Sequence, residues 1–203
     1  LDDTDTTANA ASALNRAQSA QEFLDATSDF VSPQQNMVYA DVDGNIGYIA
    51  PGRIPVRNEG NLTRGFVPGL GWDAAYDWQG YLPFEELPQV HNPASGIVVT
   101  ANENVLETNL PDYPHFITSE WSDPYRGNRI WTLLGETNKH TLATNASLQT
   151  DTKSTFAEDI LPRLIDATDE TAVDTKILTD LDLWDGFDAG VDRWEMTLFQ
   201  TWI

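Results

Sequence analysis

The sequence predicts an α+β fold, in which helices flank a central region of strands and long ordered loops. Apolar residues recur at three-to-four spacing near both ends of the chain, as they do on the buried face of a helix. Between these ends, residues 37–50 alternate around a turn, and residues 51–96 hold most of the proline and glycine. With 203 residues, 40% of them hydrophobic, the chain is long enough to bury a sizeable core.

The first half of the chain is expected to form a helix and then a hairpin. Residues 8–29 carry Leu14, Phe23 and Leu24 at helical spacing, and the run SPQQN ends this helix. In MVYADVDGNIGYIAPG two alternating runs flank DGN, which predicts a β-hairpin. DVDGN also resembles the start of a calcium loop, but the acidic end of an EF-hand is missing, so a hairpin turn is the preferred interpretation. The loop region that follows is expected to pack on its aromatic side chains.

The second half is expected to contain one buried strand, a loop and then several helices. The strand is GIVVTAN, the loop is LPDYPHFITSEWSDPYRG, and the helices cover residues 128–136, 154–167, 169–186 and 192–203. Ser154 is the expected N-cap of the second of these helices. The last helix has an apolar face and no C-cap, so we expect the chain to be one part of a longer protein.

Charge is the most unusual bulk property of the chain. There are 32 acidic residues against 11 basic ones, which gives a net charge of −21 and a pI near 4.1. Such a field repels phosphate backbones and anionic membranes, and no run of 18 apolar residues exists, so neither nucleic acid nor membrane is a predicted partner. Many Asp, only three Lys and a folded core favour a halophilic organism over an ordinary acidic secreted protein.

Several common chemistries have no support in the sequence. The chain has no cysteine, which excludes disulfides and thiolate metal sites. Its three histidines, His91, His115 and His140, show no metal-ligand spacing, and the GxSxG motif is absent. The sequence therefore predicts no metal and no classical nucleophile constellation.

Three blocks together resemble the penicillin acylase (penicillin amidase) family of N-terminal-nucleophile hydrolases. They are QNMVYADVDGNIGYIAPGRIPVR, GLGWDAAYDWQGYLPFEELPQVHNPASGIVVTANEN and PYRGNRIWTLL, in the family's order. The resemblance extends through LQTDTKSTFAEDILPRL and LWDGFDAGVDRWEMTLFQTWI, so it covers nearly the whole chain. It implies that residues 1–145 are part of a four-layer αββα hydrolase core with long ordered loops. Residues 146–203 would then be a mainly helical segment, truncated at its C-terminus.

The resemblance also implies the chemistry. These enzymes cut amide bonds with the hydroxyl of a serine that self-cleavage places at the N-terminus of the β-chain. Its own α-amino group, which titrates near neutrality, is the general base. That serine is absent from this chain, which matches an internal part of the β-chain. The remaining segments of the same acylase, the α-chain and the rest of the β-chain, are therefore the expected partners, together with a small-molecule amide substrate.

Two asparagines end the run NPASGIVVTANEN, although asparagine is a poor strand residue. An uncharged amide donor suits an oxyanion site. In the family this donor lies six residues after the glycine of NPxSG, which is Gly96 here, so the resemblance implies Asn102. Asn104 is the alternative if a bulge shifts the register. Arg129 matches the family's arginine that orients the nucleophile region and the oxyanion asparagine, with Arg126 as the alternative.

Two further positions follow from the same resemblance. Gln35 falls where the family has an acyl-pocket residue, and Met37 would pack next to it; a polar residue there argues against a purely benzyl-type pocket. Some members bind a structural calcium, for which the resemblance implies a carbonyl ligand near Thr63. No acid lies where the later ligand should fall, so we predict neither calcium nor another cofactor.

The preferred function is removal of an acyl group from penicillin-like or other N-acyl compounds. The alternatives are an acyl-homoserine lactone acylase and a non-catalytic fragment or pseudoenzyme that acts as a binding scaffold; the Trp-rich motifs disfavour a purely structural acidic surface protein. An upstream processing junction that ends in serine would separate enzyme from scaffold. We expect the parent protein to be extracellular or in the cell envelope, with its signal outside this segment.

Overall fold

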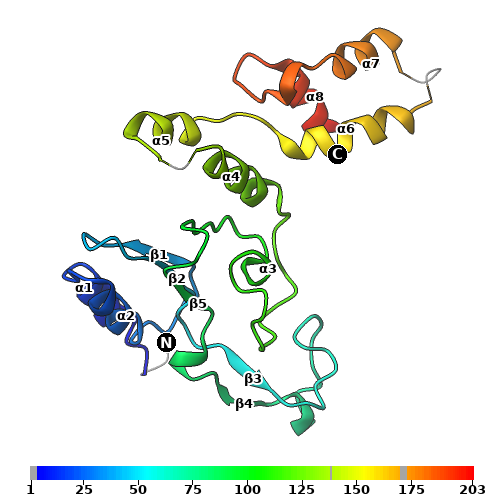
Figure 1. Cartoon of the computed structure of the whole chain (residues 1–203). Coiled ribbons are helices and arrows are strands. Elements are labelled where there is room, and N and C mark those ends of the chain that lie inside the picture. The colour runs from blue at the N-terminus through cyan, green and yellow to red at the C-terminus, as the bar shows by residue number, and fades with distance from the viewer. Residues whose placement is uncertain (1–3, 138, 170–172) are drawn as a thin grey trace. The chain divides into compact units, whose positions relative to one another are not determined.

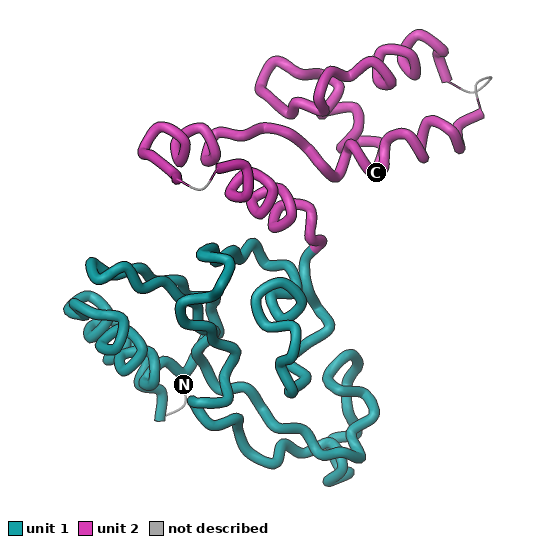
Figure 2. Tube along the Cα trace, in the orientation of Figure 1, with its two compact units in different colours: residues 1–122 teal, residues 123–203 magenta. Residues whose placement is uncertain are grey.

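The chain divides into two compact units, residues 1–122 (unit 1) and residues 123–203 (unit 2) (Figure 2). The computed structural model describes residues 4–137, 139–169 and 173–203. Unit 1 mixes helices and strands, whereas the regular elements described in unit 2 are helices (Figure 1). The predicted α+β class is therefore confirmed. The boundary predicted between residues 145 and 146 was meant to separate the hydrolase core from a helical segment. The division at residue 122 is based on compactness instead, so it does not test that boundary, which stays a prediction.

Unit 1 contains two small antiparallel sheets. Its helices are α1 (Thr7–Leu14), α2 (Ala20–Thr27) and α3 (Val105–Asn109), with short 3₁₀ helices at Ala74–Tyr76 and Phe84–Glu86. Its strands are β1 (Met37–Ala40), β2 (Ile46–Ile49), β3 (Pro55–Arg57), β4 (Trp78–Tyr81) and β5 (Gln89–His91). The first sheet has the order β1-β2-β5, and the second pairs β3 with β4. The central strand β2 thus carries a neighbour on each edge and both faces of the first sheet are available for packing.

Those two faces of the first sheet pack against different helices. On one face the ring of Tyr39 lies over Gly47, where a Cβ atom would collide with it. The same ring packs in a tilted arrangement against Phe23 of α2, with the ring centroids 5.0 Å apart. On the other face Tyr48 packs with Ala50 and with Val105, the first residue of α3. Because neighbouring residues of a strand point to opposite faces, Gly47 and Tyr48 separate the two layers.

The predicted β-hairpin is confirmed, with β1 and β2 paired from Met37 opposite Ile49 to Ala40 opposite Ile46. The carboxylate of Asp41 closes its turn, because Oδ1 accepts the N–H groups of Asp43 and Asn45 at 3.0 and 2.9 Å. The Asn45 side chain also donates to Asp41, and this bond has the largest effect on the pKa of the carboxyl. Together with the backbone bonds it holds the pKa of Asp41 below its usual value. The DVDGN run is therefore a turn whose acid is already occupied by backbone and amide donors.

The single helix predicted over residues 8–29 is wrong, because the chain forms α1 and α2 with a break between them. The hydroxyl of Ser19 caps α2 by accepting the N–H of Glu22 at 3.2 Å. In return the Glu22 carboxylate accepts the N–H of Gln18 at 2.8 Å. This S-x-x-E arrangement starts a new helix at Ala20, and the apolar spacing alone did not reveal it.

The strand predicted for residues 96–102 is also wrong. Val99 and Ala101 are buried, as expected, and Ile97 and Val98 are half-buried, but the backbone pairs with side chains instead of a neighbouring strand. Asn109 donates to the Val99 carbonyl at 2.8 Å, and the Glu103 carboxylate accepts the Ala101 N–H at 2.7 Å. Buried apolar side chains are compatible with a strand, but a strand also requires a ladder partner.

The predicted loop region 51–96 is ordered but is not packed on its tryptophans. It contains β3, β4 and β5, yet Trp72 and Trp78 are 84% and 59% exposed. The expectation that aromatic side chains form its interior is therefore wrong for these two residues. The loop predicted to follow residue 110 is confirmed as far as Pro124.

Unit 2 is helical, with α4 (Tyr125–Gly135), α5 (Leu142–Gln149), α6 (Thr155–Asp166), α7 (Thr175–Asp182) and α8 (Trp194–Trp202). A 3₁₀ turn, Asp185–Phe187, joins the last two. Its core combines one buried face from each of three helices with a tryptophan from the turn: Ala157, Leu161, Leu181, Trp184 and Phe199. No helix in the described part of the chain is both long and apolar enough to cross a bilayer.

The predicted helices of unit 2 are confirmed with small changes at their ends. The hydroxyl of Ser154 caps α6 as expected, accepting the Ala157 N–H at 3.1 Å. The helix predicted over 169–186 begins only at Thr175, where Asp174 caps it, and residues 170–172 lie outside the described residues. The helix α5 was not predicted, although Thr141 and Thr144 form a capping box at its start.

Candidate active site

Asn102 lies on the loop between β5 and α3, in a conformation that the neighbouring residues hold in place. Its φ of +70° is in the left-handed region, which asparagine tolerates better than most residues. Ala101 and Glu103 on either side are buried, whereas Asn102 is exposed. Its carbonyl accepts the N–H of Ser122 at 3.0 Å. The backbone at Asn102 is thus held by a hydrogen bond to Ser122 and by the buried residues on either side, while Asn102 itself is exposed.

Asn104, two residues further on, has its amide engaged within α3. Its Oδ1 accepts the N–H of Leu106 at 3.3 Å, and its Nδ2 donates to Oε1 of Glu107 at 2.7 Å. Asn104 is therefore the N-cap of α3. The N-x-x-E spacing from Asn104 to Glu107 is a capping pattern that was present in the sequence.

A buried tyrosine, Tyr48, packs against the start of the helix that follows this loop. Tyr48 of β2 is completely buried and packs against Val105, and its hydroxyl donates to Oδ1 of Asn36 at 2.7 Å. Burial, and after it the nearby Tyr113 and Glu103, raise the pKa of Tyr48. The phenol therefore keeps its proton and stays a hydrogen-bond donor.

The predicted acyl-pocket residues flank the residue that receives this bond. Gln35 precedes Asn36 and is exposed, with Nε2 donating to the Gln34 carbonyl at 2.9 Å. Met37 follows it as the first residue of β1 and is half-buried. Tyr48 consequently joins the segment 35–37, through its hydroxyl, to the start of α3, through its packing with Val105. The acyl-pocket role of Gln35 and Met37 stays a prediction.

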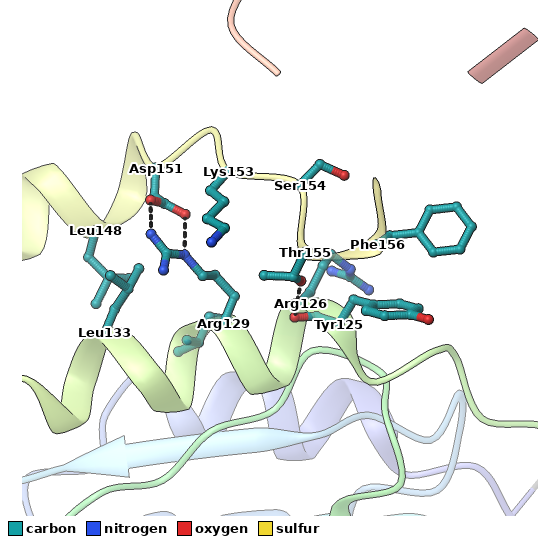
Figure 3. A pocket seen from close by; sticks show the side chains of 11 residues that line it. Tyr125, Arg126, Arg129, Leu133, Leu148, Asp151, Lys153, Ser154, Thr155 and Phe156 are labelled. Atoms are coloured by element: carbon teal, nitrogen blue, oxygen red, sulfur yellow. Dashed lines mark hydrogen bonds and ion pairs between the residues drawn. The ribbon is translucent and has the colours of Figure 1, made fainter. Parts of the chain in front are cut away.

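Arg129 lies on α4 in unit 2 and forms a two-pronged ion pair (Figure 3). Its Nε donates to Oδ2 of Asp151 at 2.9 Å and its Nη2 to Oδ1 at 2.6 Å. The pair raises the pKa of Arg129 and lowers the pKa of Asp151. Because Asn102 belongs to unit 1, the predicted orienting role of Arg129, or of its alternative Arg126, stays a prediction. Spacing rules did not indicate Asp151, which is 22 residues away in sequence.

The same ion pair lines a pocket of about 270 Å³ in unit 2. As Figure 3 shows, Leu133 and Leu148 form an apolar end beside the pair, and Tyr125 and Phe156 lie toward the other end. The hydroxyl of Thr155 donates to the Tyr125 carbonyl at 3.2 Å and joins α6 to the start of α4. The lining is mixed, with the acidic and basic groups of the pair compensating each other.

The three histidines have protein partners. Tyr39 and Asn92 hydrogen-bond the two ring nitrogens of His91 at 2.8 and 3.1 Å, and His115 pairs with Glu86 at 2.8 Å. His140 lies 3.0 Å from the Leu134 carbonyl. Within residues 4–137, 139–169 and 173–203, no group of three His, Asp or Glu side chains is arranged to hold a metal ion.

Thr63, near which the resemblance implies a carbonyl ligand for calcium, lies in a turn. The Thr63 carbonyl accepts the N–H of Phe66 at 2.9 Å, and the Thr63 hydroxyl donates to Asn61 at 2.8 Å. Calcium needs six to eight oxygen ligands, several of them usually carboxylates. The expected absence of calcium stays a prediction.

The structure combines an α+β fold with an exposed asparagine whose backbone is held by hydrogen bonds. Among solved structures, a thermostable penicillin G acylase from Alcaligenes faecalis is similar over 99% of this chain and 37% of its own, with a TM-score of 0.70 and 25% identity. The family model for penicillin amidase matches residues 1–203. The chain therefore belongs to the penicillin amidase family, as the sequence blocks predicted.

Two curated relatives show the range within the family. The penicillin acylase 2 proenzyme of Pseudomonas sp. (strain SE83) is 33% identical over 68% of this chain and 17% of that protein. The acyl-homoserine lactone acylase QuiP of Pseudomonas fluorescens (strain Pf0-1) is 36% identical over 71% of this chain and 17% of that protein. The chain thus spans about a sixth of the length of these relatives. The predicted halophilic source stays a prediction.

Proposed function

We propose that the protein to which this chain belongs is an acylase that hydrolyses the amide bond of penicillin-like or other N-acyl compounds. The family membership and the acylase names of both relatives support this proposal. A serine on another segment of the same protein is the nucleophile, and this chain contributes the oxyanion site. The protein acts outside the cell or in the cell envelope and requires no cofactor.

The observation that carries the proposal is the placement of Asn102. It is exposed on a loop whose backbone is held by hydrogen bonds at Ala101 and Ser122. An oxyanion donor requires a backbone that is already fixed, because the donor must be in place before charge develops. Asn104 instead caps α3 with its side chain.

In the proposed reaction the serine hydroxyl attacks the carbonyl carbon of the substrate amide. The α-amino group of that serine takes the hydroxyl proton, and the carbonyl oxygen becomes an oxyanion. Nδ2 of Asn102 donates a hydrogen bond to this oxygen, a contribution of about 3–4 kcal/mol to the transition state. Collapse of the intermediate breaks the C–N bond, the leaving amine receives the proton, and water then releases the acyl group from serine.

A second candidate is hydrolysis of acyl-homoserine lactones at their amide bond. It is favoured by the relatives named QuiP, which are 31–36% identical to this chain. Both candidates use the same donor, so they differ in the acyl group and the leaving amine. Turnover of a phenylacetyl amide against turnover of a long-chain acyl-homoserine lactone distinguishes them.

The test is steady-state kinetics of Asn102→Ala in the full-length, processed protein. We expect kcat to fall about a hundredfold to a thousandfold with little change in KM, because the bond forms fully only in the transition state. Asn102→Asp should be worse, since a carboxylate would face the oxyanion. Processing of each variant is verified by mass.

Asn104→Ala is the matched control, because it removes a helix cap of the same residue type. It should lower stability by about 1 kcal/mol and leave kcat nearly unchanged. Full activity in both variants would refute this loop as the oxyanion site, and loss of activity in Asn104→Ala alone would move the donor by two residues. A wild-type protein without amidase activity would favour the binding-scaffold alternative.

A further inference from the structure

Glu103 is the only charged residue among the buried residues of the part of the chain that the structure describes, with 1% of its surface exposed. An unpaired carboxylate in a protein interior is costly, so its presence requires a compensating role. The residue directly precedes the N-cap of α3 and directly follows Asn102. Its position in the chain therefore links the helix to the loop that presents the candidate donor.

The two oxygens of this carboxylate are in different situations. Oε2 accepts the N–H of Ala101 at 2.7 Å, a short bond within the interior. Oε1 is buried and has no hydrogen-bond partner among the described residues. The first bond closes a ring around Asn102, because it joins the residue before Asn102 to the residue after it.

We propose that Glu103 is the positioning residue of Asn102, a proposal that rests on the acylase function proposed above. The bond from Ala101 restricts the backbone torsions of Asn102 from inside the protein, and the bond from Ser122 to the Asn102 carbonyl restricts them from the other side. Together they hold the left-handed φ of +70° at which the Asn102 side chain is accessible. Glu103 does not contact the substrate in this proposal.

A negative charge beside a developing oxyanion would destabilise it, so the carboxylate of Glu103 has to lie away from the Asn102 side chain. Glu103 is buried and Asn102 is exposed, so the negative group lies on the interior side of the loop and the amide on the outer side. On that interior side the acid lies close enough to Tyr48 to raise the pKa of its phenol. The hydrogen-bond acceptor at Ala101 is thus provided without placing a charge at the outer surface of the loop.

The test combines kinetics with a double-mutant cycle in the full-length, processed protein. Glu103→Leu keeps the bulk of the side chain and removes the acceptor. We expect kcat to fall about tenfold to a hundredfold with KM unchanged, because a misplaced donor loses transition-state stabilisation. Glu103→Gln keeps a carbonyl acceptor for Ala101 and should retain kcat within about threefold. In an Asn102→Ala background, Glu103→Leu should cost less than about twofold, since the group it positions is gone.

A structural measurement and a control separate positioning from general loosening. Hydrogen exchange of peptides covering residues 97–104 should be faster in Glu103→Leu and unchanged in Glu103→Gln, whether or not Asn102 is catalytic. Val105→Ala is the matched control, because Val105 is equally buried, lies two residues further along the chain and has no polar atom in its side chain. It should lower the melting temperature and keep kcat within about threefold. If Glu103→Leu does not accumulate as folded protein, Glu103→Asp, with its shorter reach, replaces it.

Three results would overturn the proposal: unchanged hydrogen exchange in Glu103→Leu, equal kcat losses in the Leu and Gln variants, or a full additional loss in the Asn102→Ala background. Failure of the acylase function gives a different result. In that case Asn102→Ala keeps the activity of the parent, while hydrogen exchange still decides whether Glu103 holds the loop.

Discussion

Units 1 and 2 are stabilised in different ways. In unit 2 rings from three segments meet in one core, with Phe156 and Trp184 at 5.4 and 6.4 Å from the ring of Phe199. In unit 1 the cluster of buried residues around Tyr48 is small, and the long loops are held by side-chain bonds to the backbone, such as those at Val99 and Ala101. A packed helical core tolerates little loss of volume, whereas a hydrogen-bonded loop tolerates little loss of geometry. Substitutions should therefore act on stability in unit 2 and on turnover in unit 1.

The largest stability effect is expected at the centre of the helical core. Phe199→Ala should lower the free energy of unfolding of the full-length protein by about 3–5 kcal/mol, because it removes a completely buried ring and leaves a cavity. Urea unfolding measures this loss. At a temperature where the variant is folded, kcat should match that of the parent.

Leu183→Ala is the control for this substitution, since Leu183 lies in the same unit but is 72% exposed. Its effect should stay within about 0.5 kcal/mol. A proportional loss of kcat in Phe199→Ala would contradict the separation between the two units.

A smaller effect, on specificity, is expected in unit 1. If Gln35 lines the acyl pocket, Gln35→Ile should shift preference toward apolar acyl groups by about tenfold to a hundredfold, because an apolar surface replaces an amide. The ratio of kcat/KM for apolar and polar acyl substrates measures this shift. Gln34→Ile, at the adjacent exposed position, is the control and should leave the ratio unchanged. An identical profile in Gln35→Ile and parent would reject the pocket assignment.

The ion pair of unit 2 should contribute about 1 kcal/mol, in a pH-dependent manner. Arg129 lowers the pKa of Asp151, so the stabilisation is complete above the ordinary aspartate pKa near 4. It is lost as the pH falls through the lower pKa of the folded state. Asp151→Asn should therefore destabilise the protein at pH 7 and have progressively less effect in acid.

The control for this pair is Asp180→Asn. Asp180 pairs with Lys176 on the surface of α7, where the lysine side chain is 77% exposed, so little change is expected at any pH. Urea titrations of both variants at several pH values provide the comparison. A pH-independent effect of Asp151→Asn would show that packing, and not the charge pair, is responsible.

The smallest effect concerns the whole chain. A net charge of −21 should make the parent protein melt several degrees higher in molar KCl than in dilute buffer, because salt screens the repulsion. Thermal melting of the parent at the two salt concentrations measures this. Equal melting temperatures would remove the physical support for a halophilic origin.

The sequence predicted α4, α6, α7 and α8 from their apolar residues at helical spacing, and in α6 a capping serine added a second signal. Ser154 caps α6 as expected, and the apolar residues expected on its stripe pack against the core, namely Phe156, Ile160, Leu164 and Ile165. It failed at residues 8–29 because spacing of apolar residues does not detect a cap inside a periodic run, here at Ser19. It failed at residues 96–102 because burial of Val99 is common to a strand and to a packed loop, and the partners of the backbone lie elsewhere in the sequence.

The candidate site was predictable only in part, for the same physical reason. The family resemblance points to Asn102, and the N-x-x-E spacing identifies Asn104 as a cap. The role of Tyr48 follows from contacts with Asn36 and Val105, which are distant in the sequence and meet only in the folded chain. Glu103 could not be found from sequence either, because an acid in a polar-looking run is ordinarily expected at the surface.

The position of Tyr48 also affects how the sequence of this scaffold can evolve. Its ring packs with Val105, at the start of the helix that follows the Asn102 loop, and its hydroxyl donates to Asn36, between Gln35 and Met37. Under the proposed function, mutations of the acyl-pocket segment and mutations near the oxyanion donor therefore both depend on Tyr48. Selection for a new substrate would encounter epistasis at this tyrosine, and libraries that vary both regions together, with Tyr48 kept constant, should yield active variants more often than those that vary it.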